Sequence, residues 1–265
     1  MGRMSKLPTL FLSHGAPNLA LRASPTRAFL EGLGASLPRP DAILVMSAHF
    51  EAPEHFVVAN EKPDVIYDFS GFEQELYSMR YEAPGAMALA LEAADLAAKA
   101  GFKSHAATGR GFDHGTWVPL RLAYPQADIP VAQIAIERGA DGRHHADLGL
   151  ALSSLREKNV LIVGSGALTH NLQAYFRGGY AKDAPAPAWV DAFGDWICDR
   201  ATAGDLDSIA DTMVAAPHAQ ENHPSDEHFL PLPFAMGAAG PGGKGTRLYA
   251  GRENGVLLLD AYRFD

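Results

Sequence analysis

The chain has 265 residues, of which 47% are hydrophobic and 20% are charged, and its formal net charge is -9. This composition predicts a globular protein with a sizeable core. The acidic balance, without a basic cluster, argues against nucleic acid and anionic membranes as partners. No apolar stretch is long enough to span a bilayer. Cys198 is the single cysteine, and the N-terminus lacks a signal-peptide cleavage pattern, so we expect a cytoplasmic protein.

Short apolar runs alternate with helix-like segments along the chain. The runs at 8–13, 42–48, 130–136 and 159–165 are typical of strands buried on both faces. Helices are expected at 86–100, at 143–157, from 187 onward and from Asp226 onward. This alternation predicts an α/β fold, as one domain over residues 1–265, with a mostly parallel or mixed central sheet covered by helices on both faces. The segment 255–264 would add a further strand, at an edge.

Three of the expected strands each lead to a histidine. His14 follows "LFLS", His49 follows "LVMSA", and His170 follows "LIVGSGALT". Parallel strands place their carboxyl ends at one edge of a sheet, where ligands bind in open α/β proteins. Three imidazoles held together make a site for zinc, iron or a similar ion. His114 in "RGFDHGTW" and His228 in "HPSDEHFLPL" would add two more, as ligands or proton carriers.

The other histidines are expected to have no role in this site, because a single histidine is more often structural or exposed than functional. This group contains His55, His105, His144, His145 and His218. His144 and His145 lie at the start of an expected helix, where we expect them to be solvated. The sequence leaves the role of His223 open.

An ordered set of motifs then resembles one family, the DOPA-type extradiol ring-cleaving dioxygenases of the class III, or LigB, superfamily. The motifs are "LFLSHGAP", "VMSAHF", "IYDFSGFEQELYSMRYEAPG", "RGFDHGTWVPL", "SGALTHNL" and "HPSDEHFLPL". The resemblance extends over nearly the whole chain. It implies a non-haem Fe(II) centre, with Zn(II) as an ion found in purified protein. The implied reaction uses O2 to open the ring of a small-molecule catechol, DOPA or a relative, to a muconic semialdehyde.

The resemblance also implies a set of metal ligands. His14, His49 and His228 match three ligands of the family's metal. Some members of the superfamily use a carboxylate as the third ligand, so Glu227 is the rival of His228; on a helix the two side chains would point about 100° apart. His170 matches the catalytic acid/base and is also a candidate fourth ligand to zinc.

Further residues are expected near the substrate by the same resemblance. His114 matches a second catalytic histidine, which contacts the substrate without binding the metal. Asp113, its neighbour, is a weak candidate for orienting its ring, because adjacent side chains seldom meet. Tyr67, Asp68 and Phe69 of "IYDFSGF" are expected to shape the mouth of the pocket.

Two other kinds of protein fit the histidines taken alone. One is a zinc-dependent hydrolase that activates water. The other is a non-catalytic, Memo-like binding protein with the same fold, since a fold does not fix a function. Oxygen uptake in the presence of catechols separates these alternatives, because only the dioxygenase consumes O2. The sequence leaves the physiological catechol, the native metal, the bond that is cut and the oligomeric state undetermined.

Overall fold

The computed structural model describes residues 6–181 and 183–265 of the chain. Its centre is an eight-stranded mixed sheet in the order β4-β3-β5-β2-β6-β1-β10-β7, and β8 and β9 pair separately. The strands are β1 Thr9–Ser13, β2 Ala42–Ala52, β3 His55–Val58, β4 Ser104–Ala107, β5 Val131–Glu137, β6 Val160–Gly166, β7 Gly245–Tyr249, β8 Arg252–Glu253, β9 Leu257–Leu258 and β10 Ala261–Phe264.

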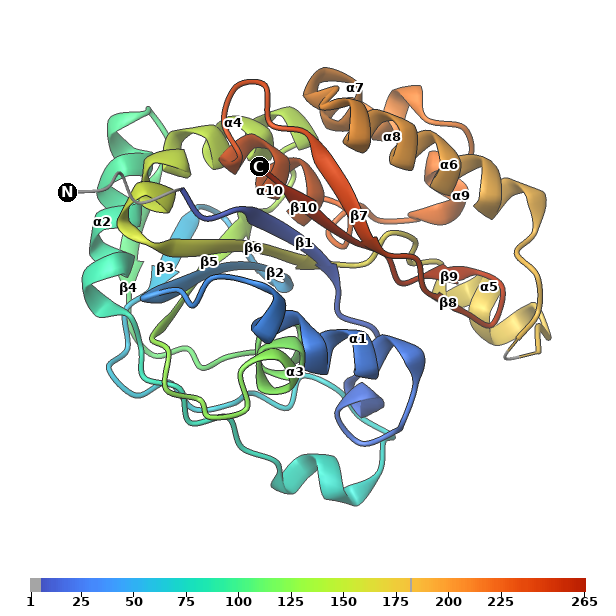
Figure 1. Ribbon diagram of the computed structural model, residues 1–265, viewed down its shortest axis with the longest axis horizontal. Helices are drawn as coiled ribbons and strands as arrows, with labels where there is room; N and C mark the ends of the chain where they lie inside the picture. Colours follow the sequence, from blue (N-terminus) through green and yellow to red (C-terminus); the bar gives the residue numbers. More distant parts are fainter. Residues whose placement is uncertain (1–5, 182) are drawn as a thin grey trace.

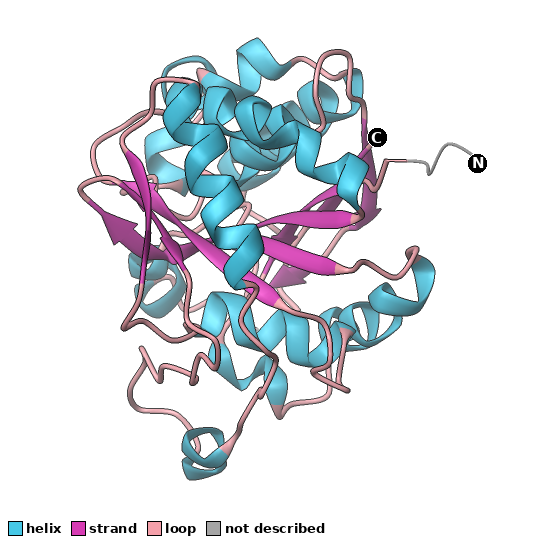
Figure 2. Cartoon of the chain, turned by 90° about the vertical axis from the view of Figure 1, so that its left-hand side faces the viewer, coloured by secondary structure: helices cyan, strands magenta, loops and turns pink. Residues whose placement is uncertain are grey.

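Helices cover both faces of this sheet. The α-helices are α1 Pro25–Leu33, α2 Met87–Lys99, α3 His114–Ala123, α4 Gly142–Leu152, α5 Leu172–Arg177, α6 Ala188–Ala203, α7 Leu206–Ala210, α8 Thr212–Ala215, α9 Ala219–Asn222 and α10 Pro231–Ala238. Short 3-10 helices lie at Pro17–Ala20, Gly34–Ser36, Gln74–Ser78 and Ser153–Lys158. Figure 1 shows α1 and α3 below the sheet and α4 and α10 above it, and Figure 2 shows the same layers from the side. The predicted α/β class with a mixed central sheet is therefore confirmed.

The central strands explain why their sequences are apolar at consecutive positions. In β2, Ile43 and Val45 pack into the core that contains residues of α1 and α3. Leu44 and Met46 point to the opposite face and pack with residues of α2, α4 and α10. Because successive side chains of a strand alternate between faces, a strand covered on both sides must be apolar throughout.

The strand order brings three of the predicted histidine positions to one edge of the sheet. β6 lies between β2 and β1, and it is parallel to both. The carboxyl ends of these three strands therefore lie side by side. This arrangement positions the residues that end or follow β1, β2 and β6 next to one another.

Several boundaries differ from the sequence-based expectation. The second helix ends at Leu152 and continues only as a 3-10 segment. The helix expected from Asp226 begins at Pro231, whose missing N–H and fixed φ suit the first helical position, so the preceding residues form a turn. The C-terminal strand β10 is not at an edge, because β7 pairs with its outer side. The strands β3, β4, β7 and β8 were not predicted.

Candidate active site

His14 is held at the end of β1 by a defined hydrogen-bond chain. Its backbone N–H donates to Gly166 O of β6 at 2.9 Å, and its side chain is buried. Nδ1 lies 3.1 Å from Ser165 Oγ, and this hydroxyl donates its only proton to Gly115 O. Ser165 must therefore accept from His14, so Nδ1 of His14 carries the proton. The lone pair on Nε2 of His14 is left free for a ligand.

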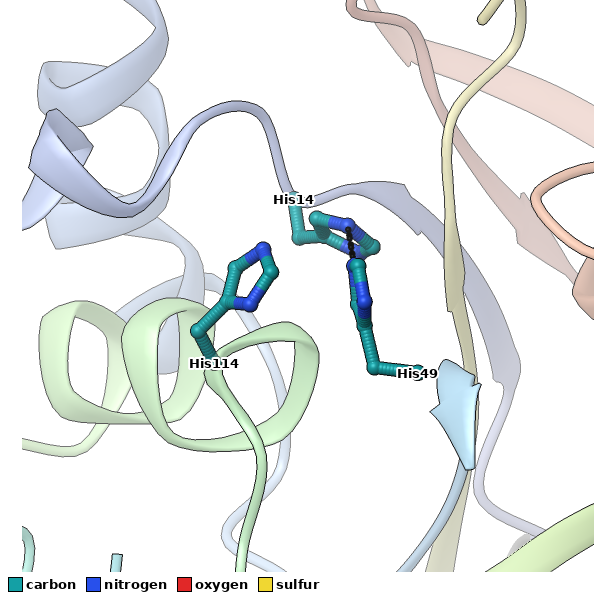
Figure 3. Close-up of side chains that lie close together, drawn as sticks. All are labelled: His14, His49 and His114. Carbon is teal, nitrogen blue, oxygen red and sulfur yellow. Dashed lines mark hydrogen bonds between the residues drawn. The ribbon is translucent and has the colours of Figure 1, made fainter. Parts of the chain in front are cut away.

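His49 lies inside β2, three residues before its end, and not after the strand as the sequence suggested. The β2–β5 register shifts between Met46 and Glu51, and this irregularity surrounds His49. Such bulges re-aim side chains at the ends of sheets. Nδ1 of His49 faces Asp68 Oδ2 at 3.4 Å, and Nε2 lies 3.1 Å from Nε2 of His14. Figure 3 shows the two rings facing each other, with His114 approaching from α3.

His228 comes from the turn before α10 and reaches the same place. Its Nε2 lies 3.3 Å from Nε2 of His49, and its side chain is buried. Its Nδ1 lies 2.8 Å from Oε1 of Glu227. The expectation that Glu227 and His228 point apart is wrong, because these residues form a turn and not a helix. A carboxylate can only accept here, so Nδ1 of His228 donates and its Nε2 is free.

The Nε2 lone pairs of His14 and His228 thus point toward Nε2 of His49. His49 Nε2 lies 3.1 Å from His14 Nε2 and 3.3 Å from His228 Nε2. Two nitrogens bound to one ion at 2.0–2.1 Å are separated by about 3.0–3.4 Å in octahedral or tetrahedral geometry. Without a cation, a proton on Nε2 of His49 can bridge to one of these lone pairs, and a bound ion would replace it. The donor set therefore fits a divalent transition metal.

His170 stacks directly on His228. The ring centroids are 3.4 Å apart and the planes are inclined by 14°. The backbone N–H of His170 donates to Asn222 O at 2.9 Å, which holds this segment after β6. Ligand atoms of His170, Glu227 and His228 lie within 4.8 Å of one another. The structure therefore places His170 beside the group formed by His14, His49 and His228.

His114 is the first residue of α3 and is held by Asp68. Asp68 accepts two hydrogen bonds, from the backbone N–H of His114 and from its Nδ1, each at 2.9 Å. The ring of His114 lies 4.0 Å from that of His49, centroid to centroid. Ligand atoms of His14, His49 and His114 also lie within 4.8 Å of one another. Asp68, expected only to shape the pocket, therefore contacts two of the site's histidines.

Asp113 has a structural role that the sequence did not suggest. It is fully buried and caps α3 by accepting from the backbone N–H of Thr116 at 3.2 Å. It also accepts from Ser47 Oγ at 2.6 Å and from Arg110 at 3.1 Å. Arg110 in turn donates to the backbone carbonyl of His49. Asp113 thus fixes the segments that carry His49 and His114, while Asp68 contacts the His114 ring.

Two glycines allow these segments to approach closely. A Cβ at Gly115 would lie 2.5 Å from Ser47 Oγ and 3.2 Å from the His14 ring. A Cβ at Gly166 would lie 2.1 Å from the carbonyl oxygen of His228. Only glycine leaves room at these two contacts, so both residues help to set the positions of the histidines.

Aromatic side chains lie beside the histidines on the α3 side. The ring of Phe69 meets that of His114 edge to face, with centroids 5.8 Å apart. Tyr67 and Tyr77 extend this group, at 6.1 Å and 5.3 Å from Phe69. The hydroxyl of Tyr67 donates to Met79 O at 2.8 Å, and this hydrogen bond fixes the orientation of the Tyr67 side chain. This group offers an apolar wall next to His114.

Burial keeps the facing histidines neutral. It lowers the pKa of His14 and of His228 well below the ordinary value, and the surrounding imidazoles lower both further. Burial and the neighbouring His114 lower the pKa of His49 to about 3. Burial alone would raise the pKa of Asp68. The hydrogen bonds and charge of His114 outweigh this effect, so the pKa of Asp68 is lowered. Neutral imidazoles next to an ionised carboxylate suit a cation.

The family profile described as the catalytic LigB subunit of aromatic ring-opening dioxygenase matches residues 11–252. The chain belongs to this family. It is an extradiol aromatic ring-opening dioxygenase, as the sequence motifs implied. Neither the zinc-dependent hydrolase nor the Memo-like binding protein is favoured.

Among the residues that the structure describes, no helix combines the length and apolar character needed to cross a membrane.

Relatives extend over almost the full chain. The protein named 4,5-DOPA dioxygenase extradiol from Beta vulgaris is 41% identical over 260 residues, covering 97% of this chain and 96% of that protein. The protein of the same name from Escherichia coli (strain K12) is 34% identical, covering 88% and 86%. A crystal structure of an uncharacterised Escherichia coli K12 protein is 28% identical, with a TM-score of 0.78 and coverage of 98% and 100%.

Proposed function

We propose that this dioxygenase opens the ring of a DOPA-type catechol beside the diol, at an Fe(II) ion held by His14, His49 and His228. The observation that carries the proposal is the convergence of the three Nε2 atoms, at 3.1 Å and 3.3 Å. Each ring directs its Nδ1 to an oxygen of Ser165, Asp68 or Glu227, which leaves Nε2 to bind the ion. The names of the relatives from Beta vulgaris and Portulaca grandiflora support a DOPA-type substrate.

Glu227 is assigned as the partner that orients His228. Its Oε1 lies 2.8 Å from Nδ1 of His228, and the other ring nitrogen, Nε2, faces His49. A carboxylate in this position fixes the ring and makes its other nitrogen a better donor. This assignment makes His228, and not Glu227, the third ligand. Zn(II) would fit the same nitrogen donors in purified protein.

When bound, Fe(II) would supply the Lewis acidity and one-electron chemistry that O2 requires. His170 moves the proton in our proposal. Burial lowers its pKa below the ordinary histidine value, so the ring is neutral near pH 7 and can accept a proton from a catechol hydroxyl. It then returns this proton as the ring opens. Its stacking on His228, with 3.4 Å between ring centroids, holds it next to one of the proposed metal ligands. The site's aromatic wall would hold the catechol ring itself.

His114 stabilises negative charge on the reacting oxygens in this scheme. The ionised carboxylate of Asp68 accepts from Nδ1 of His114 at 2.9 Å and fixes the orientation of this ring. With a hydrogen on Nε2 as well, the ring would present Nε2–H to the substrate. In a site that excludes water, such a donor stabilises a developing anion more than water would. Phe69, edge to face with His114, lies where it would exclude water from this contact.

The test is anaerobic loading with Fe(II), followed by mixing with oxygenated buffer and a panel of DOPA, a caffeate-like catechol and catechol itself. We expect one O2 consumed per catechol, a yellow product, and a product mass equal to substrate plus O2. Zinc-loaded protein and a His49→Ala variant serve as controls that should not consume O2. Absence of O2 uptake by the iron-loaded enzyme with every catechol would contradict the proposal.

A further inference from the structure

We propose that His55, Glu137 and His144 form a second site for a divalent transition metal of the Zn2+ class, separate from the histidines described above. Their ligand atoms lie within 4.8 Å of one another. The three residues come from β3, from the end of β5 and from the first turn of α4. The tertiary fold therefore assembles this group from segments that are far apart in the sequence.

The distances between the three ligand atoms suit one ion. Nε2 of His55 lies 2.9 Å from Nε2 of His144 and 3.5 Å from Oε2 of Glu137. Nε2 of His144 lies 3.1 Å from the same oxygen. Zinc binds nitrogen and carboxylate oxygen at about 2.0–2.2 Å, which separates neighbouring ligands by about 3.0–3.5 Å. Two imidazoles and one carboxylate favour zinc-like ions over Mg2+ or Ca2+.

The surroundings of His55 prepare its ring for this role. Its Nδ1 lies 2.9 Å from the backbone carbonyl of Ala135, an atom that can only accept. Nδ1 therefore carries the proton, and the lone pair of Nε2 points toward His144 and Glu137. The side chain of His55 is fully buried, so water cannot satisfy this nitrogen directly.

The neighbouring side chains fix the other two ligands and leave access for an ion. Asp141 caps α4 by accepting from the backbone N–H of His144 at 2.9 Å. The backbone N–H of Glu137 donates to Nε2 of His145 at 3.2 Å. The side chains of His144 and Glu137 are 30% and 25% exposed, so an ion can enter from solvent on their side.

His145 is excluded as a fourth ligand. Its Nδ1 lies 2.7 Å from Asp141 O, and its Nε2 accepts from the Glu137 backbone, so both ring nitrogens are occupied. It is fully buried, which corrects the expectation that His145 is solvated. Water would complete the coordination from the exposed side. An ion here would join β3, β5 and α4.

The site can be tested by counting bound Zn2+ in metal-depleted, full-length protein after dialysis, using elemental analysis. We expect two equivalents in the wild type, one in Glu137→Gln, one in His49→Ala, and none in the double variant. His144→Ala should behave as Glu137→Gln does. His105→Ala is the matched control: His105 is an exposed histidine beside the carboxylate of Glu54, at 3.7 Å, and its loss should leave two equivalents.

A second readout separates metal binding from folding. Circular dichroism of the metal-free variants should match that of the wild type, and iron-loaded Glu137→Gln should keep its ring-opening rate. Zn2+ should raise the melting temperature of His49→Ala but not that of His49→Ala/Glu137→Gln. The proposal is overturned if folded Glu137→Gln and His144→Ala both bind as much Zn2+ as the wild type. In that case, a hydrogen bond from Nε2–H of His144, and not a metal ion, would hold the three side chains together.

Discussion

Glu227 Oε1 lies 2.8 Å from Nδ1 of its sequence neighbour His228, whereas Nε2 of the same ring faces His49. This contact assigns different roles to the two neighbours, which the sequence could not do: His228 binds the ion in our proposal, and Glu227 orients His228. A residue that binds the ion directly should be indispensable for binding. A residue that only orients a ligand should tune the affinity.

We expect Glu227→Gln to retain the metal with about 10–100-fold weaker affinity, as is typical when a partner of a ligating histidine is changed. His228→Ala should lose most of the binding, because it removes a ligand. Calorimetric titration with Zn2+ measures both. If Glu227→Gln abolishes binding while His228→Ala preserves it, the ligand assignment is wrong and Glu227 is the third ligand.

His170 and His49 should separate chemistry from binding. His170→Ala should keep much of the metal and reduce the ring-opening rate by about 10²–10⁴-fold, the usual contribution of a general acid/base. His49→Ala should instead lose the active-site metal, because its Nε2 lies between those of His14 and His228. Metal content and single-turnover rates of both variants provide the comparison. Equal metal loss in the two variants would identify His170 as a ligand first.

His114→Phe should leave the iron content unchanged and lower kcat/KM with every catechol. The physical reason is that the ring, held by Asp68 at 2.9 Å, supplies a hydrogen bond to the reacting oxygens but does not hold the ion. Iron analysis and steady-state kinetics test the two halves of this expectation. Wild-type turnover in this variant would remove His114 from the mechanism, and loss of iron would make it a ligand.

Gly115→Ala should disturb the site without touching the ion. The new methyl group would lie 2.5 Å from Ser47 Oγ and 3.2 Å from the ring of His14, so α3 or the Ser47 side chain must shift next to His14. We expect at least about tenfold weaker metal binding. Gly32→Ala in α1 is the matched control, because a Cβ there meets no atom within 4 Å, and it should stabilise the helix by up to about 1 kcal/mol. Equal metal affinity in the two variants would argue against this packing constraint.

Acid should destabilise the metal-free protein partly through His223, which lies outside the ligand set. Burial lowers the pKa of His223 to about 4, although its hydrogen bond to Leu168 O opposes this shift. His223 therefore takes up a proton near pH 6.5 in the unfolded state but only near pH 4 in the folded state. Stability is lost as pH falls through this window, by about 2 kcal/mol between pH 7 and pH 5.

The measurement is urea unfolding of metal-free wild type and His223→Gln at these two pH values. Glutamine can still donate to Leu168 O but does not titrate, so the variant should lose less stability on acidification. Identical pH dependence in both proteins would show that His223 does not contribute.

The sequence by itself determined the family and the main components of the site. Apolar runs that end near His14 and His170 indicate parallel strands with polar tips, because a strand covered on both faces has no other place for a functional polar group. The ordered motifs identified the same histidines and the ring-opening chemistry. These signals are local, so they can be read from the residues next to one another in the chain.

The tertiary structure decided which partners those residues have. Asp68 contacts His114 across 46 positions of sequence, and Ser165 contacts His14 across 151. No local pattern encodes such pairs, because they depend on how strands and loops are placed around the sheet. For the same reason, the sequence did not predict the group formed by His55, Glu137 and His144, because no local motif marks any of the three residues. Their side chains meet only because β3, β5 and α4 pack together.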